Sequence, residues 1–503
     1  MNRLILYIGL MCCVSLNIYG QTLNGKQQVQ QHAQQNAKQQ VQSGTQLNAK
    51  LNAQLNALLK EDVLRTSEVG ISVYNLTAGK KVFAYQDAKL YRPASIEKII
   101  TSVTALAELG ADYTFDTRLS MTGKIENDTL KGKLMVSGAL DPLFMEEHLD
   151  SLVSSLSQRG VRHITDSLIA DVSLKDSVYW GPGWSWDDTP YSFQPYLSPL
   201  MLNKGCVTVY VSPTQRDSLP NVVCRPKSTY YTVLNKAQSY QPQAGKLKVT
   251  RNWLHNGNQL MVAGNVETTQ KKEVNVYRSE EFFMQVLMEK LKKQGIEVSG
   301  YRYKYQDNSH TDSLHTDSLQ TLAVVHRPIR EVLKEALKES DNLCAEAMFY
   351  HLAALRAWGK PVSAEDGTEA IQAFITQKLG LNPDLYNIVD GSGVSLYNYV
   401  SPRLMMEYLK YAYYHREVFL PFYEALPIAG VDGTLKHRMT KTKGRGNVHA
   451  KTGSVKGVSS LAGYVRAGNG DMMAFVIINQ NVLKLSRARA FQDKLCRILS
   501  QTP

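Results

Sequence analysis

Three short motifs, spread over most of the chain, place the strongest constraint on how this sequence folds. Ser95-Ile96-Glu97-Lys98 opens a segment whose apolar residues have helical spacing and which ends at Gly110. Ser340-Asp341-Asn342 lies between two helical segments, and Lys451-Thr452-Gly453 lies on a segment with the alternation of a strand. If the motifs form one site, both ends of the chain build one domain. Most of the chain between Ser95 and Ser340 must then be inserted.

Ser95 and Lys98 have the chemistry of an activated nucleophile. Residues three apart lie on one face of a helix, so Lys98 can take the proton of the Ser95 hydroxyl. The helix N-terminus also offers backbone N–H groups to a developing oxyanion. Alone, the pair is more simply a helix N-cap serine and a surface lysine. Together and in this order, the three motifs are the signature of penicillin-recognising serine enzymes.

The segments around these motifs predict a sheet made from both ends of the chain. VGISVYNL and KKVFAY alternate around a turn at residues 77–80, and SSLAGYVRA and DMMAFVIINQN flank a turn at residues 468–470. SRARAFQDKLCRIL is typical of a closing helix. We expect an α/β (α+β) domain in which an antiparallel sheet carries helices on both faces. The insert is predicted to be β-rich, with a few helical pieces.

The beginning of the chain indicates export. Residues 1–20 combine Arg3 with a short apolar run and are predicted to be a cleaved signal peptide; a retained anchor is the alternative. Residues 21–46 are a glutamine-rich tether, followed by a helix with a stripe of Leu47, Leu51 and Leu55. The net charge of +12 favours an anionic partner, and export argues against a nucleic-acid partner.

The cysteines that follow the predicted leader, and the other motifs of the chain, indicate no cofactor site. Cys206, Cys224, Cys344 and Cys496 follow the leader, with no Cys/His cluster of the kind that binds zinc. In an oxidising compartment Cys206 and Cys224 could form a disulfide, and two free thiols are the equal alternative. No nucleotide-binding or metalloprotease motif occurs either. We therefore expect no metal and no organic cofactor.

Several longer segments resemble one family. The resemblance covers about residues 60–500 and includes RPASIEKIITSVTAL, GPGWSWDD, SPLMLNKGCVTV, ESDNLCAEAM, DGSGVS, GVDGTLKHRM and HAKTGSVKGVSSLAGY. The sequence is similar to the D-alanyl-D-alanine carboxypeptidase/endopeptidases of the class C low-molecular-mass penicillin-binding proteins, the penicillin-binding-protein-4 type. This implies a serine β-lactamase/transpeptidase-like domain interrupted by a second domain, which is itself interrupted by a third.

The resemblance implies a role for each motif residue. Ser95 would attack the carbonyl of a D-Ala-D-X bond in a peptidoglycan stem peptide, with neutral Lys98 as the base. Ser340 would relay the proton to the leaving amine, and Asn342 would bond Lys98 and the substrate backbone. The backbone N–H groups of Ser95 and Ser454 would form the oxyanion hole. Lys451 and Thr452 would hold the terminal carboxylate, and β-lactam antibiotics would act as inhibitors.

The resemblance also bears on positions outside the three motifs. Asp188, in GWSWDD, would meet the amino end of the stem-peptide side chain, and Phe193 would pack against that chain; a solvated aspartate and a core aromatic are the alternatives. The family often has arginine where this chain has Leu396, which puts in question how a distal carboxylate is held. Lys456 could compensate, although a surface lysine is the simpler interpretation.

These observations combine into one organisation and one leading function. The predicted parts are a signal peptide (1–20), a tether and lead-in helix (21–59), the first part of the transpeptidase-like domain (60–114), inserted domains (115–324) and its second part (325–503). We expect a periplasmic serine D,D-peptidase with at most peripheral membrane association. A β-lactamase-like hydrolase is the alternative, and a non-catalytic wall-binding protein is disfavoured by the intact motifs.

Overall fold

The computed structural model describes residues 49–305, 319–357 and 359–502. The predicted signal peptide and glutamine-rich tract, together with Leu47, lie outside these residues. A helix at residues 49–58 leads into the folded body, where Leu51 and Leu55 are buried as the leucine stripe predicts. In the described part of the chain, no helix is both long and apolar enough to cross a membrane.

The first sheet joins the two ends of the chain. Its five strands are antiparallel and run in the order β18-β19-β20-β1-β2, with β1 from the front of the chain paired to β20 from the back. The strands are β1 (Glu68–Asn75), β2 (Lys80–Tyr85), β18 (His449–Val455), β19 (Val458–Arg466) and β20 (Met472–Gln480). The predicted antiparallel sheet from both ends of the chain is thus confirmed.

Helices cover both faces of this sheet. On one face, the 49–58 helix and α10 (Leu485–Gln501) bury leucines and aromatics against Ile71 and Phe475. On the other face, a larger helical group packs against Tyr464 and Val476. That group contains α2 (Glu97–Glu108), α5 (Ile329–Lys334), α6 (Asn342–Ala354), α7 (Ala364–Gln377), α8 (Pro402–Tyr414) and α9 (Arg416–Ala425). Successive strand residues point to opposite faces of the sheet, so each strand contributes apolar side chains to the core on either face.

The chain between α2 and α5 forms mixed sheets beside this body. One five-stranded sheet contains β3 (Thr114–Met121), β6 (Leu134–Ser137), β8 (Leu168–Asp171), β16 (Tyr301–Lys304) and β17 (Gln320–Pro328). A four-stranded sheet contains β4 (Lys124–Glu126), β5 (Thr129–Lys131), β7 (His163–Ile164) and β15 (Glu297–Val298). Helices α3 (Glu146–Ser157) and α4 (Ser279–Lys293) pack on them, in agreement with the helical pieces predicted for the insert.

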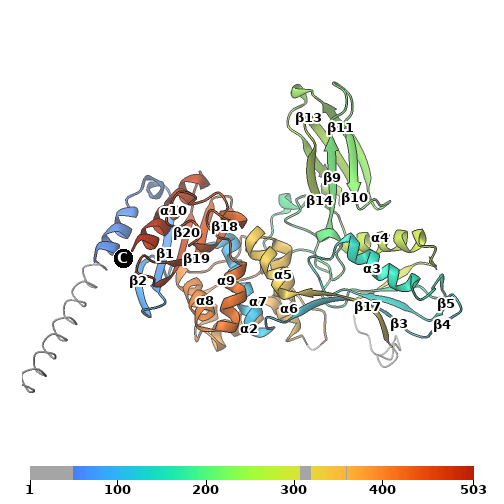
Figure 1. The fold of residues 1–503 in the computed structure, drawn as a ribbon, viewed down its shortest axis with the longest axis horizontal. Helices are drawn as coiled ribbons and strands as arrows, with labels where there is room; N and C mark the ends of the chain where they lie inside the picture. Colours follow the sequence, from blue (N-terminus) through green and yellow to red (C-terminus); the bar gives the residue numbers. More distant parts are fainter. Residues whose placement is uncertain (1–48, 306–318, 358, 503) are drawn as a thin grey trace, which may run out of the picture.

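Residues 206–275 form an arm that projects from this inserted region, as Figure 1 shows. Two three-stranded sheets build the arm, in the orders β10-β9-β14 and β11-β13-β12. The strands are β9 (Cys206–Ser212), β10 (Asn221–Arg225), β11 (Thr232–Ser239), β12 (Lys248–Arg251), β13 (Gln259–Val266) and β14 (Gln270–Asn275). The insert is therefore β-rich, while the exact domain limits stay a prediction.

The cysteines of the described region are all free thiols. Cys206 is buried at the base of the arm, and Cys224 is half-buried on β10. Of the two alternatives for this pair, the structure therefore has the free thiols.

Candidate active site

Ser95 stands at the start of the helix that carries Lys98, as predicted. It lies in a short 3-10 turn (Ala94–Ile96) that runs directly into α2. The preceding Ala94 has a φ of 50°, a left-handed conformation that costs energy for a residue with a side chain. The turn leaves Ser95 half-buried while Lys98, one turn later, is completely buried.

The Lys98 ammonium is held by three acceptors. Its Nζ donates to Ser95 Oγ at 3.1 Å, to Asn342 Oδ1 at 2.7 Å and to the Ser392 carbonyl at 2.7 Å. Burial lowers the pKa of Lys98 to about 8, although the carboxyl groups of Asp390 and Glu346 act in the opposite direction. A lysine with this pKa is neutral in about a tenth of molecules at pH 7, against well under ~0.1 % for an ordinary lysine.

The Ser340-Asp341-Asn342 motif forms the turn before α6. Ser340 is half-buried, has a φ of 63° and ends the preceding helical segment. Asp341 caps α6 by accepting a hydrogen bond from the Cys344 N–H at 2.9 Å. On its other side Asp341 pairs with Lys204 at 2.6 Å. This pairing lowers the pKa of Asp341, although burial alone would raise it.

Lys451 brings the third motif to the same place. It is fully buried on β18, and its Nζ donates to Ser340 Oγ at 2.7 Å. Burial, together with the charge of Lys98, sets the pKa of Lys451 well below its ordinary value. Gly453 lets β18 lie close to Ser460 and to the Pro93 backbone, because a Cβ at this position would lie 2.1 Å from Ser460 Oγ and 2.7 Å from the Pro93 carbonyl oxygen. The structure thus gathers Ser95, Lys98, Ser340, Asn342 and Lys451.

Thr452 and Ser454 lie on the more open side of β18. Thr452 is half-buried and its hydroxyl donates to Thr434 Oγ1 at 2.9 Å. Ser454 is exposed, and its hydroxyl accepts a hydrogen bond from Arg489 on α10 at 3.4 Å. Both residues lie within three positions of Lys451 on β18, and their role in substrate binding stays a prediction.

The segment that contains Asp188 and Phe193 is tied to the motif residues. Phe193 is 44 % exposed, and its backbone carbonyl accepts a hydrogen bond from Asn342 Nδ2 at 2.8 Å. A cavity of about 190 Å³ lies here and is lined in part by Phe193, Lys204 and Asn342. Asp188 is half-buried, and its pKa is raised by burial and by the neighbouring Asp187. Phe193 is therefore not a core aromatic, and it stacks on Tyr191.

The structure adds residues that the sequence analysis did not single out for this site. Ser392 contributes its carbonyl to Lys98, and Asp390 holds the loop by accepting from Trp184 Nε1 at 2.9 Å. Glu346, on α6, is buried with its pKa raised to about 8 by desolvation and by Asp390. Ser392 and Asp390 lie in the DGSG segment, and only tertiary packing makes the Ser392 carbonyl a lysine acceptor.

An arginine from a distant part of the chain lies beside Leu396. Arg92 Nε donates to the Leu396 carbonyl at 3.0 Å, and its guanidinium lies 5.8 Å from the centre of the Tyr399 ring. Lys456 is exposed in the turn between β18 and β19. A compensating role for Lys456 stays a prediction.

Comparisons with known proteins agree with this geometry. The D-Ala-D-Ala carboxypeptidase 3 (S13) family matches residues 51–502. A D-alanyl-D-alanine carboxypeptidase of Haemophilus influenzae is 29% identical over 419 residues, which cover 82% of this chain and 85% of the relative.

A solved structure from the same organism is also similar. Penicillin-binding protein 4 of Haemophilus influenzae has a TM-score of 0.76 and 27% identity, covering 89% of this chain and 99% of that one. The same protein in complex with a novel β-lactam has a TM-score of 0.68 and 26% identity, covering 86% and 97%. These likenesses confirm the predicted transpeptidase-like fold. The chain belongs to the D-Ala-D-Ala carboxypeptidase 3 (S13) family and is a serine peptidase.

Proposed function

We propose that this enzyme cleaves D-Ala-D-X bonds of peptidoglycan stem peptides through an acyl-enzyme on Ser95. The observation that carries the proposal is the buried Lys98, whose amine contacts the Ser95 hydroxyl at 3.1 Å and whose pKa burial lowers to about 8. Such an amine can take a hydroxyl proton at neutral pH, whereas an ordinary surface lysine cannot. Family membership and the likeness to penicillin-binding protein 4 support the substrate class.

Acylation follows from the contacts around Ser95. The Ser95 oxygen forms a bond with the substrate carbonyl carbon while its proton passes to neutral Lys98. Ser340 touches Lys451 and can carry a proton to the departing amine, so the leaving group departs uncharged. Water then adds to the ester and releases the shortened peptide, which restores the Ser95 hydroxyl.

Substrate binding is assigned to the residues that border this centre. Lys451 and Thr452 would hold the terminal carboxylate, because a carboxylate beside Lys451 favours the protonated amine, and that ammonium with a neighbouring hydroxyl suits one carboxylate. The backbone N–H groups of Ser95 and Ser454 would stabilise the oxyanion. Asp188 and Phe193 would contact the amino end and the aliphatic part of the stem-peptide side chain.

Inhibition by β-lactams follows from the same chemistry. A β-lactam presents a carbonyl carbon and a nearby carboxylate, the two groups that Ser95 and Lys451 would meet in the peptide. The likeness to a relative solved with a β-lactam supports this assignment. We further propose that the protein acts in the periplasm after cleavage of residues 1–20, the segment with the composition of an export signal.

Intact-mass analysis tests the proposal directly. Protein lacking residues 1–20 is incubated with benzylpenicillin beside a Ser95→Ala variant. We expect a single long-lived adduct that the variant does not form. Loss of penicillin without a lasting adduct would instead favour the β-lactamase-like alternative, and an adduct that persists in the variant would refute Ser95 as the nucleophile.

A Lys451→Gln variant separates binding from chemistry. Because Lys451 is assigned to the carboxylate, the variant should raise KM for a D-Ala-D-Ala peptide more than it lowers kcat. An unchanged KM would contradict the assignment of Lys451 to the substrate carboxylate.

A further inference from the structure

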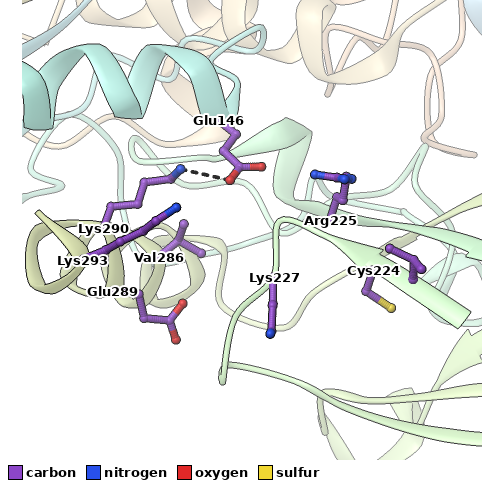
Figure 2. Close-up of a pocket in the computed structure, with 9 residues that line it drawn as sticks. Glu146, Cys224, Arg225, Lys227, Val286, Glu289, Lys290 and Lys293 are labelled. Carbon is purple, nitrogen blue, oxygen red and sulfur yellow. Dashed lines mark hydrogen bonds and ion pairs between the residues drawn. The ribbon is translucent and has the colours of Figure 1, made fainter.

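A second cavity, of about 500 Å³, lies where the arm meets helices α3 and α4. Figure 2 shows that its walls come from the start of α3, the last turns of α4, and the end of β10 with the residue pair that follows. The lining residues are Glu146, Val223, Cys224, Arg225, Lys227, Val286, Glu289, Lys290 and Lys293. None of the proposed catalytic or substrate-binding residues is among them.

The two carboxylates of this cavity are already engaged. Glu146 accepts a hydrogen bond from Lys290 at 2.9 Å, and Lys290 also pairs with Asp150 at 2.6 Å. Glu289 accepts hydrogen bonds from the Thr229 N–H at 2.8 Å and from the Thr229 hydroxyl at 2.6 Å. Glu146 is therefore paired with Lys290, whereas Glu289 is bonded to neutral donors and keeps its negative charge. With four cationic side chains and two carboxylates, the cavity lining is still net positive.

Arg225, Lys227 and Lys293 remain without a counter-ion among the described residues. In Figure 2 the Lys293 amine and the Arg225 guanidinium point toward the cavity from opposite sides. Cations that converge on a concave surface raise the local positive potential, and a bound anion relieves their repulsion. The arrangement thus favours an anionic ligand.

The position of Lys293 has a simpler explanation that covers only part of the pattern. Lysines in the last turn of a helix interact favourably with its dipole, and Lys290, Lys292 and Lys293 all lie in the last turn of α4. That effect does not account for Arg225 and Lys227, which come from the arm. Lys292 also lies outside the cavity lining, so the two explanations can be separated by experiment.

We propose that this cavity binds a phosphate group carried by a sugar or by a lipid headgroup. A phosphate offers several acceptor oxygens and more than one negative charge, which suits cations that approach from different directions. Arginine can also bond two of those oxygens at once. The cavity is larger than one phosphate ion, which leaves room for the group that carries it. The site goes beyond the proposed function and does not depend on it.

Calorimetric titration with glucose 1-phosphate tests the site, with glucose as the uncharged control. Protein lacking residues 1–20 should bind the phosphate ester and not glucose. Lys293→Gln and Arg225→Gln should each weaken binding about tenfold, since each removes one charge-assisted hydrogen bond. Lys292→Gln removes the same charge from the same helix turn and should bind as the unmodified protein does.

Vesicles distinguish the two sources of the phosphate. Binding to phosphatidylglycerol vesicles but not to phosphatidylcholine vesicles, with loss in Lys293→Gln, would assign a lipid headgroup. Acylation by benzylpenicillin should be unchanged in every variant, which shows that each is folded and that the site is separate. The proposal is overturned if neither probe binds up to about 10 mM phosphate, or if Lys292→Gln weakens binding as much as Lys293→Gln.

Discussion

Acylation of Ser95 should depend on pH through the protonation of Lys98. Only the neutral amine can accept the serine proton, so the rate should follow the neutral fraction of Lys98. Burial lowers the pKa of this lysine from its ordinary value to about 8. Because the neutral fraction of Lys98 increases as pH rises, the acylation rate should increase with pH and level off above the pKa.

The size of the effect follows from that pKa. With a pKa of about 8, the neutral fraction is about 1 % at pH 6, about 10 % at pH 7 and about half at pH 8. The second-order rate constant for acylation should therefore rise about tenfold from pH 6 to pH 7 and about fivefold from pH 7 to pH 8. Above about pH 9 it should change little.

Stopped-flow acylation by a chromogenic β-lactam, checked by intact mass, measures this constant across the pH range. Near-UV circular dichroism at each pH shows that the protein stays folded. A flat profile would refute the assignment of Lys98 as the base. A midpoint near the ordinary lysine pKa would instead show that the Lys98 amine is not desolvated in solution.

Three further variants test the surroundings of the site. Glu346→Gln should move the midpoint of the acylation profile to slightly lower pH, because Glu346, with a pKa of about 8, is ionised in about half of the molecules near the midpoint and its carboxylate raises the pKa of Lys98. An unmoved midpoint would show that Glu346 does not affect the protonation of Lys98. Lys204→Met should lower the free energy of unfolding in urea by about 3 kcal/mol by leaving Asp341 buried without its partner, and adding Asp341→Asn should recover part of that loss. Gly453→Ala should cost about 2 kcal/mol and slow acylation, because the new Cβ would lie 2.1 Å from a serine hydroxyl; wild-type stability and rate would contradict this packing.

The sequence was most informative where local geometry decides the contact. Ser95 and Lys98 lie one helical turn apart, so their spacing allows the 3.1 Å contact, and the other two motifs made that contact the expected one. The turn at Ser340 and the strand that carries Lys451 were equally visible in the patterns of their flanking segments. These features depend on residues close together in the chain.

Contacts between distant segments could not be predicted in the same way. The pairing of Lys204 with Asp341 joins the base of the arm to the turn before α6, and both residues are charged side chains of ordinary appearance in the sequence. The carbonyl of Ser392 carries no side-chain signal at all, because any residue offers the same backbone acceptor. The burial of Glu346 is likewise a product of the assembled core.

The cause of the lowered Lys98 pKa illustrates the difference. Burial has the largest effect in the structure, and the nearby carboxylates of Asp390 and Glu346 partly oppose it. Their positions come from the DGSG turn and from α6, so the balance depends on tertiary packing.

The three acceptors around Lys98 determine the direction in which its lone pair points. An ammonium ion has three N–H donors, and they are directed at Ser95 Oγ, Asn342 Oδ1 and the Ser392 carbonyl. A neutral amine keeps only two donors. Asn342 Oδ1 and the Ser392 carbonyl have no proton to give, so they retain those donors, while the serine hydroxyl alone can reverse its role. Loss of one proton therefore turns the lone pair toward the hydrogen of Ser95, and the amine needs no side-chain movement to become its acceptor.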